Sequence, residues 1–70
     1  MMRQVIVYPD LEDGGWVGEV PSLPGCITQG ETIEQVLENA RDAIETWIDG
    51  ARSTGLEVPD ETFDVRVCVV

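Results

Sequence analysis

The chain has no histidine and no lysine. Its four arginines face fourteen aspartates and glutamates, which gives a formal net charge of −10 at pH 7. Without histidine, a single chain cannot form a Ser-His-Asp or Cys-His catalytic arrangement. So acidic a surface repels phosphate backbones, and we expect no direct binding to nucleic acid. The charge suits a basic protein partner, although acidity that only keeps the protein soluble would look the same.

Cysteine and long apolar runs are also scarce. Two cysteines, Cys26 and Cys68, cannot complete a tetrahedral zinc site without histidine. No base stands near either thiol in the sequence, so we expect reduced, structural thiols in a cytoplasmic protein. No run approaches the ~20 apolar residues of a membrane span, and the opening residues 1–4 do not resemble a signal peptide. We expect no cofactor, no metal and no membrane association.

The short length limits the possible core. Seventy residues suit a single domain, residues 1–70, and a domain of this size buries only ~60% of its unfolded surface. Small folds without disulfides or metals commonly gain stability from a partner subunit. The sequence therefore predicts a homodimer or a higher homo-oligomer.

Three short strands are predicted in the first half of the chain. Residues 3–8 (R-Q-V-I-V-Y) are β-branched and aromatic, and residues 16–20 (W-V-G-E-V) and 26–29 (C-I-T-Q) follow after glycine-rich turns. Gly14 and Gly15 suit a hairpin, and Pro24-Gly25 suits the centre of a type II turn. Gly18, inside the second strand, indicates a bulge or a close backbone approach.

One long amphipathic helix is predicted from Ile33 to about Thr54. Thr32 is a good N-cap, with Gln35 three residues later, and Gly55 suits the position after the helix. Apolar residues recur in steps of three and four, which is the pattern of a helix with one buried face. They are Ile33, Val36, Leu37, Ala40, Ala43, Ile44, Trp47, Ile48 and Ala51.

A fourth strand is predicted at 62–69, where Phe63, Val65, Val67 and Val69 alternate with polar residues. The fold class is therefore α+β, with the element order β-β-β-α-β. A right-handed crossover places the fourth strand beside the first and parallel to it, in the sheet order 3-2-1-4. One helix covers one face of this mixed sheet, so a pair of apolar residues on the first strand, either Ile6 and Tyr8 or Val5 and Val7, must face solvent or a second subunit.

The order also matches part of a ribonuclease-H-like fold, in which carboxylates can hold metal ions. Asp10 lies only just past the first strand and Asp64 lies on the fourth, while the strand interiors are apolar. We therefore expect no enzymatic activity.

Acidic residues offer a better candidate site for a partner. Five carboxylates on the predicted helix step by four, four, three and four, which places them on one stripe, and three more lie in the first turn. A solvated surface is the plainer interpretation of this pattern, and a docking surface for a basic protein is the functional one. The predicted partner-binding residues are Glu34, Glu38, Asp42, Glu45 and Asp49 on the helix, with Asp10, Glu12 and Asp13 in the turn.

The central stretch from Leu23 to Ala40, L-P-G-C-I-T-Q-G-E-T-I-E-Q-V-L-E-N-A, resembles the hallmark of the HicB family of antitoxins. The family segment reads roughly Pro-Asp-Leu-Pro-Gly-Cys, followed by a polar pair, Gly, Asp/Glu-Thr and an Ala-rich helix. Here Ser22 stands where aspartate is common. The acidic turn before Trp16 and the exit from the helix between Gly55 and Pro59 are similar too, so the resemblance covers nearly all of the chain.

The resemblance implies a partial ribonuclease-H-like fold without catalytic carboxylates. It implies a toxin-neutralising protein of a type II toxin-antitoxin system, which masks a small basic HicA-like toxin that cleaves mRNA through a histidine. Longer members carry a C-terminal DNA-binding module, and this chain, which ends at Val70, is expected to be a short form without one. The alternative is an orphan oligomeric scaffold or small-ligand-binding domain with no toxin partner.

Overall fold

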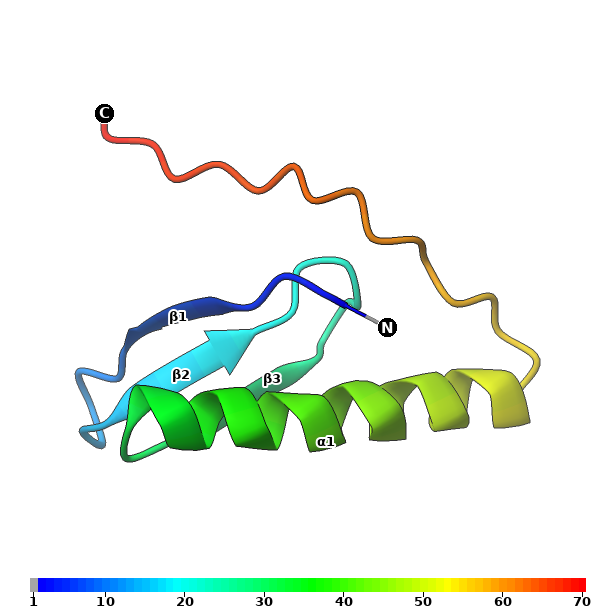
Figure 1. Ribbon diagram of the computed structural model, residues 1–70, viewed down its shortest axis with the longest axis horizontal. Coiled ribbons are helices and arrows are strands. Elements are labelled where there is room, and N and C mark those ends of the chain that lie inside the picture. Colours follow the sequence, from blue (N-terminus) through cyan, green and yellow to red (C-terminus); the bar gives the residue numbers. More distant parts are fainter. Residues whose placement is uncertain (1) are drawn as a thin grey trace.

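The computed structural model describes residues 2–70 and contains three strands and one helix. The strands are β1 (Ile6–Pro9), β2 (Trp16–Glu19) and β3 (Ile27–Gly30), and the helix α1 spans Ile33–Ser53. The strands form an antiparallel sheet in the order β1-β2-β3, and α1 lies across one face of it, chiefly against β3 and β2 (Figure 1). The predicted α+β class, the antiparallel meander and the helix are confirmed.

Glycines shape both turns of the sheet as the sequence predicts. In the β1–β2 turn, Gly14 and Gly15 have φ values of 77° and 75°, a left-handed conformation that side chains disfavour. In the β2–β3 turn, Gly25 has a φ of 79°, and the Cys26 amide donates to the Leu23 carbonyl oxygen over 3.0 Å. This is the predicted type II geometry, and it places Leu23 fully inside the core.

Both ends of α1 are capped by the predicted residues. At the start, the Gln35 amide donates to Thr32 Oγ1 over 3.1 Å, while Gln35 Oε1 accepts from the Glu31 amide. At the end, Gly55 has a φ of 77°, and the Leu56 amide donates to the Ala51 carbonyl oxygen over 2.8 Å. These are the reciprocal N-terminal cap and a Schellman-type C-terminus.

The closest contact between the helix and the sheet is made at Gly18. An added Cβ there would stand 2.4 Å from Val36 Cγ1, so only glycine lets α1 lie so near β2. The sequence indicated a bulge or a close backbone approach at Gly18, and the structure shows a close approach by side chains instead, chiefly that of Val36. Around this contact the structure buries a small apolar core, made of Val20, Leu23, Cys26, Val36, Ala40, Ile48 and Ala51.

The opposite face of the sheet has no covering layer in the described chain. Gly18 pairs with Val7, and this cross-strand pair faces the helix. Because side chains alternate along a strand, the neighbouring cross-strand pairs face the other way. Ile6 and Tyr8 belong to these neighbouring pairs, and Tyr8 is 41% exposed. Of the two pairs that the sequence offered for the uncovered face, the structure selects Ile6 and Tyr8. The open face also includes Val17, Glu19, Ile27 and Gln29.

The predicted fourth strand does not form, and the sheet order 3-2-1-4 is wrong for this chain by itself. Residues 56–70 contain no helix and no strand. This segment, which we call the tail, leaves the end of α1 and runs past β1 in the same direction as β1, without pairing to it (Figure 1). Its valines are solvated, with Val67 90% and Val69 97% exposed. The structure therefore does not show the predicted ribonuclease-H-like arrangement.

Side chains take the place of ladder hydrogen bonds where the tail passes the chain leading into β1. The Gln4 amide donates to Glu61 Oε1 over 2.8 Å, and Gln4 Oε1 accepts from the Val65 amide over 3.3 Å. Glu61 also accepts from Ser22 Oγ and from the Phe63 amide. Because the Gln4 and Glu61 side chains lie between the two backbones, the tail stays outside the distance at which strands pair.

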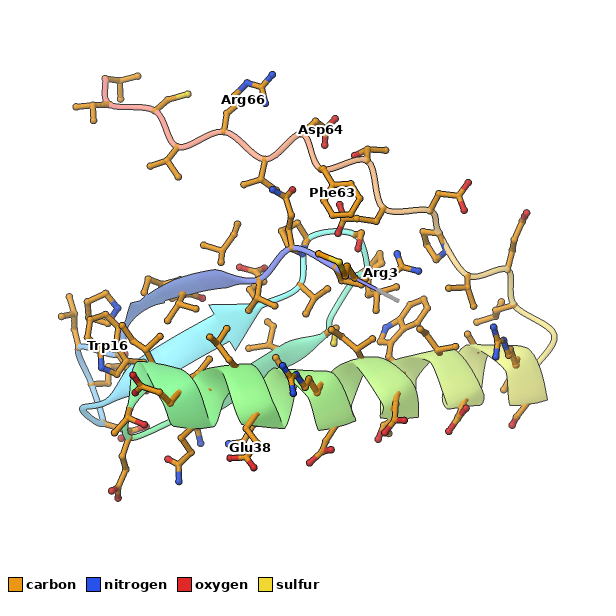
Figure 2. The ribbon with its side chains drawn as sticks, in the orientation of Figure 1. Arg3, Trp16, Glu38, Phe63, Asp64 and Arg66 are labelled. Carbon is orange, nitrogen blue, oxygen red and sulfur yellow. The ribbon has the colours of Figure 1, made fainter. Side chains whose placement is uncertain are left out.

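The backbone at Phe63 also departs from a strand. Its φ is 53°, in a region that is uncommon for bulky residues and costs of order 1–3 kcal/mol. The ring points back toward the body of the protein, whereas Asp64 and Arg66 point away from it (Figure 2). The tail therefore keeps the alternation of a strand but bends at its start.

Replacement of Gly18 by alanine tests the contact that seats the helix. We expect Gly18→Ala to lower the free energy of unfolding by ~1–3 kcal/mol, because the new methyl overlaps Val36. The matched control is Gly50→Ala in α1, where an added Cβ meets nothing within 4 Å. That change should raise stability by up to ~1 kcal/mol through helix propensity. Urea denaturation measures both, and a neutral Gly18→Ala variant would contradict the assigned packing.

Titration of Glu61 tests how the tail is held. Hydrogen bonds from the Phe63 and Gln4 amides lower the pKa of the Glu61 carboxyl below its ordinary value. A depressed folded-state pKa means that the tail contact is fully stabilising above the unfolded-state pKa and is lost as the pH falls through the folded-state pKa.

The amide resonances of Gln4 and Phe63 should therefore shift together in an NMR titration, with a midpoint below that of an unfolded glutamate. Glu61→Gln should remove this titration. A midpoint at or above the unfolded value would show that these hydrogen bonds are absent in solution.

The two thiols should differ sharply in reactivity. Both cysteines are free; Cys26 is 4% exposed and Cys68 is exposed. Burial raises the pKa of the Cys26 thiol, which lowers its thiolate fraction as well as its access. We expect a disulfide reagent to modify Cys68 at least ~100-fold faster than Cys26, which reacts only through local opening. A Cys68→Ser variant isolates the slow phase, and rapid labelling of that variant would refute the buried position of Cys26.

Candidate functional site: an acidic helix face

The five predicted carboxylates of α1 form one continuous exposed surface, which we call the acidic stripe. Its members are Glu34, Glu38, Asp42, Glu45 and Asp49, and all are exposed. Within residues 2–70, none of them takes part in a hydrogen bond or an ion pair with another side chain. Their charges are therefore available to a partner without loss of an internal contact.

The packing of α1 directs the acidic stripe outward. Val36, Ala40 and Ile48 are buried against the sheet, and the stripe lies on the far side of the helix. Glu38 points away from the sheet (Figure 2). Fifteen residue steps separate Glu34 from Asp49, so the stripe is ~22 Å long at 1.5 Å per residue. The arrangement offers a basic protein a straight row of carboxylates.

Two polar contacts that the sequence analysis did not identify fix the rotation of the helix. Trp47 Nε1 donates to the Pro24 carbonyl oxygen over 2.9 Å, and Asn39 Nδ2 donates to the Gln29 carbonyl oxygen over 2.8 Å. They tie α1 to the β2–β3 turn and to β3. Each joins residues distant in the sequence, so no local pattern could have indicated it.

The acidic turn divides into a structural residue and two exposed ones. Asp10 Oδ1 accepts from the amides of Glu12 and Asp13, at 3.0 and 3.1 Å. This carboxylate shapes the turn in the usual manner of aspartate. Glu12 and Asp13 are exposed. The structure therefore gives Asp10 a sufficient local role and leaves Glu12 and Asp13 as the surface charges of the turn.

The turn and the acidic stripe meet at one end of the molecule. A surface pocket there is lined by Asp13 and Gly14 from the turn and by Glu31 and Gln35 from the start of α1. Glu31 was not among the predicted partner-binding residues, but the fold brings it to the same pocket as Asp13, three residues before Glu34 in the sequence. Only the fold could reveal that these two carboxylates lie near each other.

Other kinds of site have little support in the described chain. Among residues 2–70, no three histidine, cysteine, aspartate or glutamate side chains stand where they could hold a metal ion. In the same residues no helix combines the length and the apolar character required to cross a membrane. The acidic surface is the most extended chemical feature that the described residues present.

Comparison with known proteins gives this surface a family context. A family model described as the HicB-like antitoxin of bacterial toxin-antitoxin systems matches residues 4–67. A UPF0150 protein of Thermoplasma acidophilum is 36% identical over 63 residues, covering 90% of this chain and 91% of that protein. A UPF0150 protein of Synechocystis is 38% identical over 59 residues, covering 84% of this chain and 80% of its own length.

A relative with a functional name matches over a shorter stretch. The protein named Antitoxin HicB 1, from Photorhabdus laumondii, is 40% identical over 45 residues, which is 64% of this chain but 29% of that antitoxin. The family model spans nearly the whole chain, and this relative connects the chain to a named antitoxin. The predicted resemblance is confirmed: the chain belongs to the HicB-like antitoxin family of bacterial toxin-antitoxin systems.

Proposed function

We propose that this protein is a non-enzymatic antitoxin that neutralises a small, basic, HicA-like mRNA-cleaving toxin by covering it. The observation that carries the proposal is the acidic stripe, five exposed carboxylates without internal partners on one helix face of a family member. A net charge of −10 attracts a basic toxin over long range, and the aligned charges orient it on approach.

The proposed contact surface consists of the acidic stripe, with Glu12 and Asp13 beside its first turn. Asp10 contributes by holding this turn in shape. Such a surface raises the association rate and the specificity more than it raises the affinity itself, because exposed carboxylates remain well solvated. Apolar contacts are therefore needed as well, and Ile33, which is 42% exposed, stands in the first turn of α1 next to Glu34 in the sequence.

The proposal treats residues 1–70 as one toxin-binding domain that works as a homo-oligomer. The open sheet face with Ile6 and Tyr8, together with the unpaired tail, supports association because it leaves apolar surface uncovered. A tail that paired with β1 in the assembled protein would complete the ribonuclease-H-like arrangement. The proposal includes no operator binding by this chain, since its surface is strongly acidic.

Charge reversal on the acidic stripe tests the proposed surface. The Glu38→Lys/Asp42→Lys double variant should slow association with a purified HicA-like toxin by ~10-fold or more at low salt. The matched control, Glu57→Lys/Asp60→Lys, changes the net charge equally but at exposed positions after the helix. The control should lose far less, because the toxin approaches the helix face. Surface plasmon resonance at several ionic strengths measures both rates.

Two outcomes would count against this function. Equal losses in the two double variants would mean that overall charge, and not the acidic stripe, governs the encounter. The wild-type chain is also mixed with the toxin of its own genome at micromolar concentration and low salt. If the two proteins form no complex, that result favours the alternative, an oligomeric scaffold without a toxin partner. Circular dichroism of each variant confirms that α1 is retained.

A further inference from the structure

The tail has the properties of a strand that lacks a neighbour. Residues 62–69 alternate apolar and polar side chains, and Val67 and Val69 are 90% and 97% exposed. A single chain gains nothing by holding these valines in water, since the burial of apolar surface is favourable. β-branched residues at alternate positions also have high strand propensity.

The sheet, for its part, has a free edge that such a strand would fit. β1 is an edge strand in the order β1-β2-β3, and its outer backbone groups are not engaged by another strand. The eight residues 62–69 match the length of residues 2–9, which comprise β1 and the segment leading into it.

Beside this edge lies a groove of about 440 Å³, which we call the β1–α1 groove. Its apolar wall includes Val5, Leu37 and Ile44, and its lining also includes the basic residues Arg3 and Arg41. The full lining is Met2, Arg3, Val5, Leu37, Ala40, Arg41 and Ile44. Two of the four cations of the protein thus stand at one groove. Like charge at this groove disfavours a segment from a basic toxin, whereas residues 62–69 carry no formal net charge.

The tail does not fill the groove of its own chain. Its start is fixed outside β1 by Glu61 and Gln4, whose side chains separate the two backbones, and Phe63 bends the chain at the same place. Beyond this bend the tail runs alongside β1, apart from the sheet, to the C-terminus (Figure 1). Pairing with the free edge of another copy releases the Val65 amide from Gln4 Oε1, a long hydrogen bond of 3.3 Å, and leaves the hydrogen bonds to Glu61 in place.

We propose that residues 62–69 of one chain pair with the β1 edge of a second copy, with Val65, Val67 and Val69 in that copy's β1–α1 groove. The second copy returns the same contact, because a twofold dimer places identical surfaces against each other. The fourth strand of the predicted sheet order 3-2-1-4 is then supplied by the partner subunit. This inference rests on the homo-oligomer part of the proposed function and is independent of the toxin.

The direct test uses the wild-type chain alone, under reducing conditions so that exposed Cys68 forms no disulfide. Isotopically labelled and unlabelled chains are mixed after denaturation and refolding, and isotope-filtered NMR detects contacts between different chains. We expect intermolecular contacts from the Val67 and Val69 methyls to those of Leu37 and Ile44. If these contacts occur only within one chain, or do not occur, the proposal is wrong.

A pair of matched variants tests the energetic role of the tail. Val67→Asp/Val69→Asp should raise the dimer dissociation constant at least ~100-fold in sedimentation equilibrium. Leu11→Asp is the control, since Leu11 is 93% exposed but lies in the β1–β2 turn, and it should leave the constant within ~3-fold. A dimer that survives the tail variant would assign association to another surface, such as the open sheet face, and refute strand exchange.

These results are separable from those on the toxin. An oligomer without the intermolecular contacts would refute strand exchange and leave the antitoxin function standing. Conversely, a chain that exchanges its tail but binds no HicA-like toxin would retain this inference and lose the proposed function.

Discussion

The packing of Val36 against Gly18 is the contact on which the rest of the arrangement depends. It lets α1 lie close to β2 and β3, and leaves β1 at the uncovered side of the sheet. Two consequences follow from this single placement. The far side of the helix is free to carry only charge, and the flank of the helix next to β1 opens into an apolar groove. A larger residue at position 18 would move the helix and alter both surfaces together.

Local chemistry made much of the fold predictable from the sequence. Pro24-Gly25, Thr32 with Gln35, and Gly55 each act within a few residues, and their turns and caps have the expected geometry. The outward position of the acidic stripe was equally accessible, because helical periodicity fixes it once the buried face is known. The structural role of Asp10 was not predicted, although an aspartate shortly before a Gly-Gly turn often accepts hydrogen bonds from the amides of that turn.

The tail is where sequence reasoning failed, and the cause is competition between distant groups. The alternation of Phe63, Val65, Val67 and Val69 indicates a preference for strand conformation. It does not indicate with which sheet edge the strand will pair. In this chain the Gln4 amide is engaged by Glu61, and the Val65 amide by the Gln4 side chain. These contacts span more than fifty residues, so neither propensity nor periodicity contains them. The meeting of Asp13 and Glu31 at one pocket escaped prediction for the same reason.

The acidic stripe has a measurable cost in the free protein, and that cost supports a functional interpretation of it. Its five members make four like-charge pairs at spacings of three or four residues, which together destabilise the helix by roughly 1–2 kcal/mol. The two capped ends of α1 offset a similar amount. Arg41 and Arg52 lie beside the stripe and offset part of this repulsion, although no ion pair joins them to its carboxylates within residues 2–70. In the proposed complex a basic partner would relieve the remaining repulsion, so that binding would also stabilise the helix.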